Sequence, residues 1–450
     1  MKKIDQYRTT LRVFCITVFS ILSTMIYFLV WDIMYNPKFE TPYHETGKIF
    51  IMFFYFVVLL VANIFLDSHK VDQLRRGEII FYGLVALLFA NAIAYAQICL
   101  IIADLANIVG MIYIVILQIV WLVAWTCIAV AIAHKMNPPE KMLIIYGSHL
   151  ATEIVYNMSQ MEDRYVIVES ANVDEGYDKL SRRIEKFDGV IICDVPARLR
   201  NDLLKFCYQQ NKSIYVIPKI SDIIIRSASD ITYFDSPIMK CHSTGLSVEQ
   251  RAVKRFFDVT ICTVAMIVAS PVFLAIALAI KLYDGGPVFY KQRRCSLDLK
   301  PFDILKFRSM IVDAEKNGPQ PAVDGDKRIT PVGKVIRALR IDELPQLINI
   351  IKGDMSIVGP RPERIEHVEK YSAEIPEFVF RYKVKGGLTG YAQVFGKYNT
   401  SAYNKLKMDL MYIQNYSLAL DFKLILMTIK ILFKKESTEG FKVKSKKDDN

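Results

Sequence analysis

The sequence predicts a membrane protein in three parts: an α-helical transmembrane bundle, an α/β Rossmann-like domain, and a mostly helical (α+β) C-terminal domain that holds a re-entrant membrane helix. Three observations lead to this fold class. The 450 residues are 52% hydrophobic yet 23% charged, with a mean hydropathy of +0.24. Long apolar runs fill the first third of the chain, and strand-like and helix-like segments alternate after them. Lipid-embedded segments joined to water-exposed domains account for such a mixture.

Four apolar runs open the chain, at 11–31, 47–66, 79–103 and 107–133. Each run is close to the ~20 residues that a helix needs to cross a bilayer. They predict a four-helix transmembrane bundle over residues 1–136. No convincing cleavage site follows the first run, so a removed signal peptide is not expected.

Basic residues set the expected orientation of this bundle. They precede the first run, fill the second connection and follow the fourth run, whereas the other two connections are less basic. By the positive-inside rule, the N-terminus and everything after residue 134 are expected on the cytoplasmic side. The polar residues Asn91, Gln97 and Gln118 lie within the runs, where we expect them to join helices by hydrogen bonds.

The middle part, residues 137–247, begins with an Asn-Pro-Pro linker and then alternates strands and helices over 140–235. This alternation predicts a small α/β domain with a parallel sheet. Its first turn, 146–149, has one glycine where a dinucleotide-binding turn needs three, so NAD binding is not expected. Asp194 follows a strand and either contacts a ribose or caps a helix. A regulatory or structural role is the better expectation.

A fifth apolar run, 259–282, carries Ser270-Pro271 at its middle and strongly basic residues on both flanks. Proline in a helix interior removes a hydrogen bond, and positive charge at both ends favours both ends on one side. We therefore predict a re-entrant helix, 256–283, that breaks at Ser270-Pro271, with Ser270 bonded to backbone groups freed by the break. An ordinary kinked spanning helix is the alternative.

The segment after this run places two acids, Asp342 and Glu343, before a pattern of Leu and Ile that predicts a helix. Pro345 suits the first turn of that helix, which puts Asp342 near its N-cap, and a lone Asp there is usually just a cap. Here basic residues surround both acids: Arg337, Arg340, Lys352, Arg361 and Arg364. Phosphoryl transfer uses such groups: a carboxylate as nucleophile, a divalent cation with oxygen ligands, and arginines that bind phosphate oxygens through two parallel hydrogen bonds.

Two further basic motifs flank the acids. In Gly-Pro-Arg-Pro-Glu, 359–363, the prolines on either side fix the backbone at Arg361, which predicts a held phosphate ligand beside Pro362 and Glu363. Lys306 and Arg308 are spaced to share one face of a strand, where they either contact substrate or form a solvated edge. Asp313 and Glu315 read as acids of an exposed segment.

These motifs, in this order over 254–433, strongly resemble the bacterial polyprenyl-phosphate phosphoglycosyltransferases, or bacterial sugar transferases. The domain order resembles their large members, with four membrane helices and a Rossmann-like domain. The resemblance implies that residues 248–450 are the catalytic domain. It implies transfer of a sugar-1-phosphate from a UDP-sugar to undecaprenyl (polyprenyl) phosphate, initiating exopolysaccharide, capsule or O-antigen assembly.

The resemblance also implies the chemistry and the surroundings. Asp342 and Glu343 would be catalytic with bound Mg²⁺, and Asp342 would attack the β-phosphate, release UMP and form a covalent aspartyl-phosphosugar. Arg361, Lys306, Arg308, Pro362 and Glu363 are the expected substrate contacts. The setting would be the bacterial inner membrane, with the active site on the cytoplasmic side and membrane lipids as partners. A homodimer is left open.

The net charge of +11 fits anionic substrates and anionic lipid, and nucleic acid is not expected because no recognition motif accompanies the charge. The eight cysteines form no CxxC pair, which argues against a zinc site or a disulfide framework. The stretch 408–435 suits helices in the membrane interface or, alternatively, packed in a core.

The chain departs from the family pattern at two places. Cys295-Ser296 and Leu299 stand where glycines are usual, and Gly386 stands where a proline is common, which bears on sugar specificity or loop shape. Two rival functions stay open at this stage: a non-catalytic membrane regulator or scaffold of polysaccharide assembly, and an NAD-dependent nucleotide-sugar dehydratase. The missing glycines of the middle domain speak against the dehydratase.

Overall fold

The computed structural model describes residues 7–136, 138–147, 164–233, 235–241, 244–312, 314, 326–396 and 400–432. The chain divides into two compact units, Met1–Ile217 and Pro218–Asn450. Most of the turn after the first strand of the middle domain, Asp313, Glu315 and the charged C-terminal tail lie outside the described residues.

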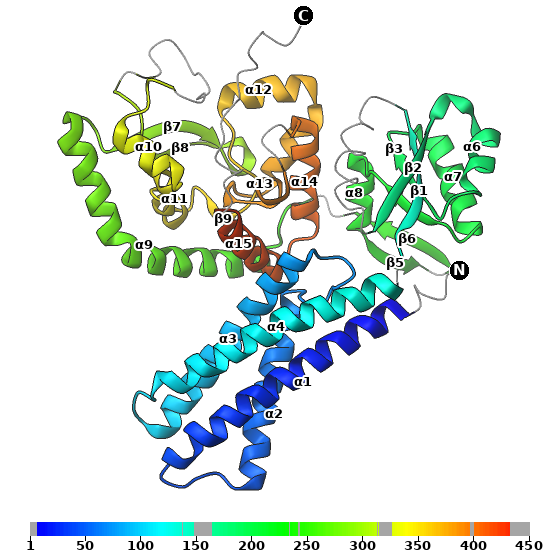
Figure 1. Ribbon diagram of the computed structural model, residues 1–450. Helices are drawn as coiled ribbons and strands as arrows, with labels where there is room; N and C mark the ends of the chain where they lie inside the picture. Colours follow the sequence, from blue (N-terminus) through cyan, green and yellow to red (C-terminus); the bar gives the residue numbers. More distant parts are fainter. Residues whose placement is uncertain are drawn as a thin grey trace, which may run out of the picture. The chain divides into compact units, whose positions relative to one another are not determined.

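The first unit begins with four long helices, α1 (Arg8–Met34), α2 (Glu45–Phe65), α3 (Arg76–Ile102) and α4 (Ile108–Met136). They coincide with the four apolar runs and pack side by side, blue to cyan in Figure 1. A 3₁₀ turn, η2 (Asn36–Lys38), follows α1. All four are long and apolar enough to cross a membrane. The predicted helical bundle is therefore confirmed.

A buried polar network joins the four helices at mid-bundle. The Tyr55 hydroxyl donates to Asn91 Oδ1 at 2.9 Å, and Asn91 Nδ2 donates to Gln118 Oε1 at 2.8 Å. Gln118 Nε2 donates to the carbonyl of Ser23 and to the Tyr55 oxygen, each at 2.9 Å. The prediction that Asn91 and Gln118 hydrogen-bond between helices is confirmed; Gln97 lies half-buried on α3.

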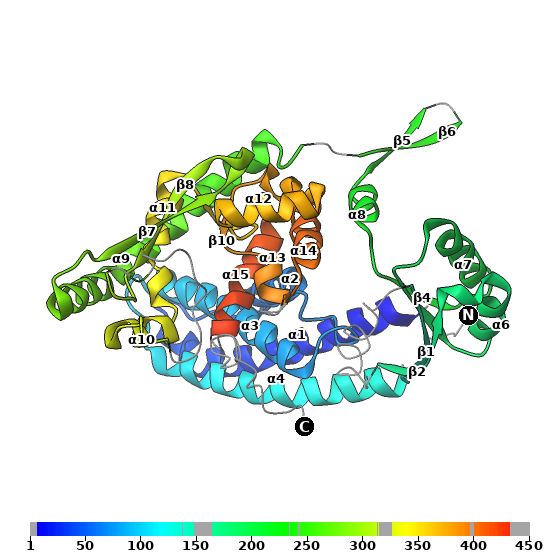
Figure 2. The ribbon, with the colours of Figure 1, turned by 90° about the horizontal axis from the view of Figure 1, so that it is seen from above.

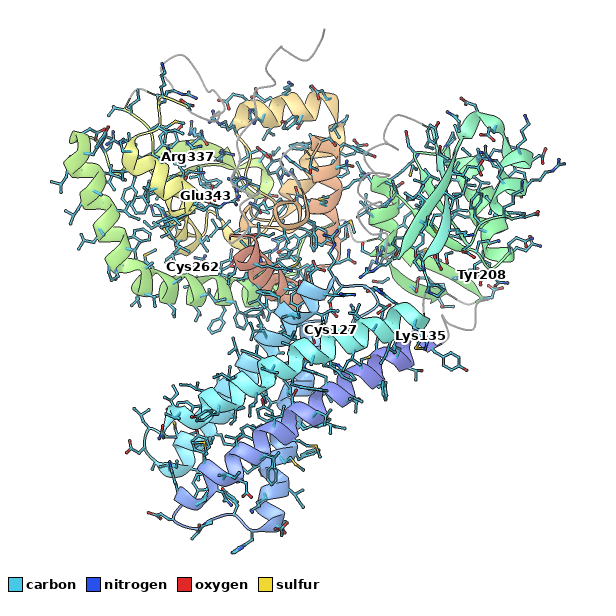
Figure 3. The ribbon with its side chains drawn as sticks, in the orientation of Figure 1. Cys127, Lys135, Tyr208, Cys262, Arg337 and Glu343 are labelled. Atoms are coloured by element: carbon cyan, nitrogen blue, oxygen red, sulfur yellow. The ribbon has the colours of Figure 1, made fainter. Side chains whose placement is uncertain are left out.

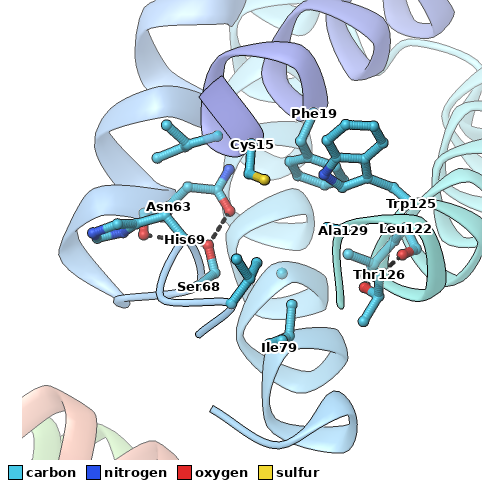
Figure 4. A pocket seen from close by; sticks show the side chains of 13 residues that line it. Cys15, Phe19, Asn63, Ser68, His69, Ile79, Leu122, Trp125, Thr126 and Ala129 are labelled. Atoms are coloured by element: carbon cyan, nitrogen blue, oxygen red, sulfur yellow. Dashed lines mark hydrogen bonds between the residues drawn. The ribbon is translucent and has the colours of Figure 1, made fainter. Parts of the chain in front are cut away.

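A small hollow between these helices is lined by α1, α3, α4 and the connection after α2 (Figure 4). Its polar groups bond to their own neighbours: Ser68 Oγ donates to Asn63 Oδ1 at 2.5 Å, and Thr126 Oγ1 donates to the carbonyl of Leu122 at 2.7 Å. The hollow is a small packing gap, about 20 Å³ in volume, between the helices.

The rest of the first unit is the α/β domain. Its sheet has strand order β2-β1-β3-β4, from β1 (Glu140–Tyr146), β2 (Tyr165–Asn172), β3 (Gly189–Cys193) and β4 (Ser213–Val216). All neighbours are parallel, as the strand–helix alternation predicts. The connections hold η3 (Val173–Glu175), α6 (Tyr177–Ile184) and α7 (Ala197–Gln209). The central strand β3 is buried along its whole length.

The turns after β1 and β3 touch each other. A side chain at Gly147 would come within 2.3 Å of the carbonyl oxygen of Asp194. Asp194 has φ 47°, and the N-cap of α7 is Pro196, so Asp194 is not the helix cap that was one reading of it. The single glycine of this turn thus serves close packing of two loops.

The second unit starts with α8 (Ile220–Arg226) and an exposed hairpin of β5 (Ser229–Tyr233) and β6 (Ser236–Lys240), seen in Figure 2. The sequence-based boundary at 247/248 does not coincide with the division between the units at Ile217/Pro218. The reason is that Ile220 and Ile223 of α8 belong to the main core of the second unit.

The remaining elements of this unit, in order, are α9 (Val248–Asp284), β7 (Phe289–Cys295), η4 (Leu297–Leu299), β8 (Pro301–Phe307), α10 (Pro331–Ala338), η5 (Ile341–Glu343), α11 (Gln346–Lys352), β9 (Ser356–Val358), α12 (Ile365–Glu374), η6 (Pro376–Lys383), β10 (Gly387–Thr389), α13 (Tyr391–Phe395), α14 (Ala402–Gln414) and α15 (Leu418–Leu432). Strands β7 and β8 pair antiparallel, and β9 and β10 pair parallel. The unit is therefore α+β and mostly helical, as predicted.

The C-terminal helices α14 and α15 contribute Leu406, Leu410, Ile413 and Leu424 to the main core. The core-packing alternative for the C-terminal stretch therefore holds for the described part. Contact with a membrane interface stays a prediction.

Helix α9 runs without interruption through Pro271, so the predicted break at Ser270-Pro271 is wrong. The helix instead follows a bent path in Figure 1. Proline cannot donate to the carbonyl four residues earlier, which is that of Ile267. The Ser270 hydroxyl donates to this carbonyl at 2.7 Å, so the predicted backbone bond of Ser270 is confirmed. Because the side chain replaces the missing donor, the helix bends and does not break.

Much of α9 is apolar and exposed, including Val264, Ile267, Val268, Val272, Leu274, Leu278 and Leu282. It is the fifth helix that is long and apolar enough to cross a membrane. Both of its ends nevertheless bind the same folded unit. Near the start Arg255 donates to the carbonyl of Ile351 at 2.6 Å, and at the end Arg308 Nη1 donates to Asp284 Oδ2 at 2.8 Å.

Candidate active site

The β7–β8 ribbon provides one wall of the candidate site. Its register places Tyr290 opposite Lys306 and Gln292 opposite Ile304, so that Tyr290, Gln292, Arg294 and Lys306 share one face. Lys306 is inside β8, one residue before its end. Arg308 lies just beyond the strand, where its backbone N–H donates to the carbonyl of Val288 at 2.9 Å.

The acid pair lies in a tight turn before α11. Arg340 has φ 54°, and the 3₁₀ turn Ile341–Glu343 follows it. Pro345 is the N-cap of α11, which begins only at Gln346, so Asp342 does not cap this helix. The prediction placed the helix start too early, because a 3₁₀ turn and an α-helix share nearly the same apolar spacing over one turn.

Glu343 joins three segments of the chain. Its Oε1 accepts hydrogen bonds from Lys306 Nζ at 2.7 Å and from Arg361 Nη2 at 2.8 Å. Burial alone would raise the pKa of the Glu343 carboxyl, but the charges of Arg361 and Lys306 outweigh it and hold that pKa well below its ordinary value. Glu343 is thus a fixed anion between two cations. Figure 3 shows Glu343 with Arg337 of α10 in the same part of the unit.

Asp342 is half-buried beside Glu343. Burial raises the pKa of the Asp342 carboxyl; the Lys306 charge opposes this effect and the Glu343 charge adds to it. Among the ion pairs of the described residues none includes Asp342, in contrast to Glu343. The adjacent acids therefore differ: Glu343 is held as an anion by two cations, whereas within the described part of the chain Asp342 forms no ion pair.

The loop 359–363 follows β9 and is held by its backbone carbonyls. The carbonyl of Pro360 accepts from Gly387 N at 2.9 Å, and that of Glu363 accepts from Cys295 N at 3.1 Å. The carbonyls of Arg361 and Pro362 accept from the side chains of Arg381 at 3.1 Å and Arg294 at 2.7 Å. The loop is thus held by hydrogen bonds from several elements as well as by its two prolines.

Sequence reasoning missed Arg294, Gln292 and Arg381 as supports of this loop. Arg294 Nε donates to Gln292 Oε1 at 2.9 Å while Nη1 of the same residue binds the carbonyl of Pro362. Side chains alternate between the two faces of a strand, so the spacing of Gln292 and Arg294 in β7 could have placed both on one face. Arg381 lies in η6 and pairs with buried Asp409 at 2.7 Å. No local signal joins residues so far apart in the chain.

The other predicted substrate contacts lie nearby but are engaged within the protein. Arg308 is buried and paired with Asp284, away from the acid pair. Glu363 lies 3.7 Å from Arg381 and 3.9 Å from Arg294. Pro362 is buried against Gly386. Of the five predicted contacts, Lys306 and Arg361 are hydrogen-bonded to Glu343 of the acid pair, and substrate contact stays a prediction for all five.

The departures from the family pattern adjoin this loop. A side chain at Gly386 would come within 2.5 Å of Pro362 Cγ, and Ser296 Oγ accepts from the backbone N–H of Gly386 at 3.1 Å. Leu299 has φ 59°, a conformation that glycine adopts without strain. Buried Cys295 ends β7, and burial raises the pKa of its thiol, which does not suit a nucleophile.

The acid pair is suited to Mg²⁺ only in company with a substrate. Among the described residues there is no cluster of three or more His, Cys, Asp or Glu side chains that could hold a metal ion. Mg²⁺ is commonly held by one or two carboxylates together with substrate phosphates and water. The adjacent carboxylates of Asp342 and Glu343 fit that mode of binding.

Comparison with known proteins places this site in a family. The profile of the bacterial sugar transferase family matches residues 249–435. A UDP-N-acetylgalactosamine-undecaprenyl-phosphate N-acetylgalactosaminephosphotransferase from Aeromonas hydrophila is 45% identical over 183 residues, 40% of this chain and 43% of that protein. A UDP-glucose:undecaprenyl-phosphate glucose-1-phosphate transferase from Escherichia coli (strain K12) is 40% identical over 198 residues, 43% of each chain.

In a shorter relative, the matched residues make up more than two thirds of the protein. The UDP-glucose:undecaprenyl-phosphate glucose-1-phosphate transferase from Caulobacter vibrioides is 44% identical over 183 residues, 39% of this chain and 68% of that protein. The matched part spans about half the length of the longer relatives, 43% to 54%. The matched residues contain the β7–β8 ribbon, the acid turn and the loop 359–363. The chain belongs to the bacterial sugar transferase family.

Proposed function

We propose that this protein transfers a sugar-1-phosphate from a UDP-sugar to undecaprenyl phosphate and releases UMP. The observation that carries the proposal is the pair of hydrogen bonds from Lys306 and Arg361 to Glu343, directly beside Asp342. This arrangement brings a carboxylate nucleophile and a fixed anion from one turn together with a cation from β8 and a cation from the loop 359–363. The names of the relatives, which act on UDP-sugars and undecaprenyl phosphate, support the same reaction.

In the first step a carboxylate oxygen of Asp342 attacks the β-phosphorus of the donor. A bond from that oxygen to phosphorus forms, the bond between the β-phosphorus and the bridging oxygen breaks, and the bridging oxygen leaves with UMP. A raised pKa makes the Asp342 carboxylate a better nucleophile than an ordinary aspartate, provided that it is ionised. The intermediate is an aspartyl-phosphosugar.

In the second step a phosphate oxygen of the polyprenyl phosphate attacks the same phosphorus. The bond to Asp342 breaks, the carboxylate is restored, and the product is a polyprenyl diphosphate sugar. No oxidant, reductant or further co-reactant is needed.

Arg361 and Lys306 would bind donor phosphate oxygens on the cationic side of Glu343. Arginine forks bind phosphate bidentately, and the loop bonds described above hold Arg361 in place before the donor arrives. Asp342 and Glu343 would hold Mg²⁺ together with the diphosphate, and the ion would neutralise charge on the phosphates.

Helix α9 would enter the bilayer and return on the same side. Its ends bind β8 and α11 through Arg308 and Arg255, and those two elements bind each other, since Asn349 Oδ1 accepts from Leu305 N at 2.9 Å. A straight helix of 37 residues would be about 55 Å long and would carry its ends apart. Re-entry would set the active site at the surface of the bacterial inner membrane, on the cytoplasmic side, where lipid phosphate and soluble nucleotide sugar meet.

The test is transfer of radiolabelled sugar phosphate from a panel of UDP-sugars to undecaprenyl phosphate in the presence of Mg²⁺. We expect UMP release with the correct donor and, in Asp342→Asn, no covalent phosphosugar adduct by mass spectrometry. Full activity of Asp342→Asn would overturn the nucleophile. Absence of transfer from every donor would favour the rival scaffold, and loss of water from a nucleotide sugar in the presence of NAD would favour the rival dehydratase.

Topology has its own test, with single cysteines at the exposed positions Gln250 and Tyr283 in a background where exposed Cys127 and Cys241 are serine. Re-entry predicts that an impermeant maleimide labels both positions from the cytoplasmic side only. Labelling of position 283 from the outside alone would establish a spanning helix. Mass photometry in nanodiscs would test the homodimer that the sequence left open.

A further inference from the structure

Two polar residues on one face of α9 bind the two segments that meet at the active site. Arg255 and Asp258 are three residues apart, so both point to the same side of the helix. Asp258 is 5% exposed, and Arg255 is half-buried. Neither lies beside the acid pair in sequence, and neither is used by the reaction proposed above.

Arg255 binds the C-terminal end of α11. Its guanidinium donates to the carbonyls of Ile350 at 2.5 Å and Ile351 at 2.6 Å. Both carbonyls belong to the last turn of α11, which ends at Gly353 in a left-handed conformation, and that of Ile350 also accepts from Gly353 N at 3.0 Å. The helix is short, and the turn with Asp342 and Glu343 leads directly into it. Arg255 therefore fixes the far end of the segment that presents the acids.

Asp258 binds β9. Its carboxylate accepts from Ser356 Oγ at 2.7 Å and from the backbone N–H of Ile357 at 3.0 Å. Strand β9 ends at Val358, and the loop with Arg361 follows at once. Asp258 therefore fixes the start of the segment that presents the phosphate-binding arginine.

The acid turn and the arginine loop face each other across the 2.8 Å bond between Glu343 and Arg361. The single turn of α9 from 255 to 258 binds both the C-terminal end of α11 and strand β9. Because α9 is bonded to both α11 and β9, it fixes the distance between the acid turn and the arginine loop that these two elements carry. Supporting hydrogen bonds orient catalytic groups in the same way in other sites.

We propose that Asp258 and Arg255 are positioning residues that set the distance between the nucleophile Asp342 and the phosphate ligand Arg361. The proposal rests on the proposed function. It assigns to α9 a second task besides membrane attachment: the membrane helix is the part to which both halves of the active site are fixed.

The first experiment measures UMP release by purified protein in nanodiscs. Asp258→Asn keeps one acceptor but turns an amide N–H toward the other donor, so we expect kcat to fall about 10- to 100-fold, with the KM for donor changed less than about threefold. Asp230→Asn, at an exposed position of the β5–β6 hairpin, is the matched control and should leave kcat unchanged. Ser356→Ala removes one of the two donors and should give a smaller loss in a protein that folds normally.

A double-mutant cycle separates positioning from general destabilisation. If Asp258 acts through Arg361, adding Asp258→Asn to Arg361→Lys should cost less than about threefold more in kcat, because the arginine that Asp258 positions is already gone. Losses that multiply, or an unchanged kcat in both Asp258→Asn and Ser356→Ala, would overturn the proposal.

A readout independent of turnover keeps this test apart from that of the reaction. Nitroxide labels at the exposed positions Lys352 and Glu366, in the Cys127→Ser, Cys241→Ser background, report the distance between α11 and α12. We expect a narrow distribution in the parent protein and a broader or shifted one in Asp258→Asn. An unchanged distribution would overturn positioning even in an active enzyme. Absence of turnover by the parent with every donor would instead overturn the reaction and leave the distance result standing.

Discussion

The hydroxyl of Ser270 lies 2.7 Å from the carbonyl oxygen of Ile267, the oxygen that loses its backbone donor because residue 271 is proline. A serine beside a proline thus repairs the helix that the proline would interrupt. In a bilayer an unpaired carbonyl is costly, since water is not present to bind it. This bond explains why α9 bends as one helix.

Ser270→Ala is therefore expected to destabilise the protein by about 1 kcal/mol, measured by thermal unfolding in nanodiscs. The control is Pro271→Ala, which restores a backbone N–H at residue 271. On that background Ser270→Ala should cost clearly less, because Ile267 again has its helical partner. Equal costs on both backgrounds would show that the hydroxyl does not serve that carbonyl.

Arg361→Lys is expected to lower kcat/KM for the UDP-sugar by about 10- to 100-fold, because a lysine cannot bind Glu343 and a phosphate with two parallel bonds. The matched control is Arg293→Lys, at an exposed position of the neighbouring strand β7. Steady-state UMP release at several donor concentrations measures both. Equal activities of the two variants would remove Arg361 from the phosphate site.

Asp409 gives the fold a pH dependence. Burial raises the pKa of its carboxyl to about 6, although Arg381 opposes this effect. The ordinary pKa of an aspartate, about 3.9, applies to the unfolded chain. Between these values the folded state binds the proton more strongly, so the contribution of this group to the free energy of unfolding falls as pH rises from about 4 to about 6.

The difference in unfolding free energy between the parent and Asp409→Asn isolates this contribution. Asp409→Asn should lack that part of the pH dependence, up to about 3 kcal/mol. It should also be less stable than the parent at pH 7, because buried Arg381 loses its 2.7 Å partner. Parallel pH curves for the two proteins would contradict the raised pKa.

Leu299→Gly is expected to stabilise the protein by about 1 kcal/mol. Leu299 has φ 59° and is 42% exposed, so glycine relieves a left-handed leucine and gives up little burial. Leu297→Gly, in the same turn but without a left-handed backbone, is the control and should destabilise. Denaturant unfolding of the isolated variants decides the sign, and destabilisation by Leu299→Gly would mean that its side chain packs against a surface.

The fold was predictable where the chain repeats one signal over many residues. The four apolar runs and the strand–helix alternation gave the bundle and the parallel sheet, because length and period alone determine them. The break in α9 was predicted wrongly, since the sequence shows a proline but not whether a neighbouring side chain satisfies the freed carbonyl. The sequence does not show that Ile220 and Ile223 join a core whose other residues lie far along the chain, and the predicted domain bounds stay a prediction.

The candidate site was predictable in its reacting groups and not in their supports. Asp342, Glu343, Arg361 and Lys306 stand in short motifs whose chemistry can be read directly, and the structure brings them together. Arg308 lies just beyond the strand of Lys306 and pairs with Asp284, a partner contributed by the end of α9. Long-range partners of this kind depend on tertiary packing, which local spacing does not encode.

The polar network of the bundle has a consequence for how the protein is made. Ser23, Tyr55, Asn91 and Gln118 come from four different helices, so the ring of hydrogen bonds closes only after the last helix has entered the membrane. Until then the polar groups of the first three helices lack the hydrogen bonds that Gln118 supplies in the folded bundle. The order of synthesis therefore constrains folding: Asn91 and the carbonyl of Ser23 gain their hydrogen bonds to Gln118 only when the fourth helix has joined the other three.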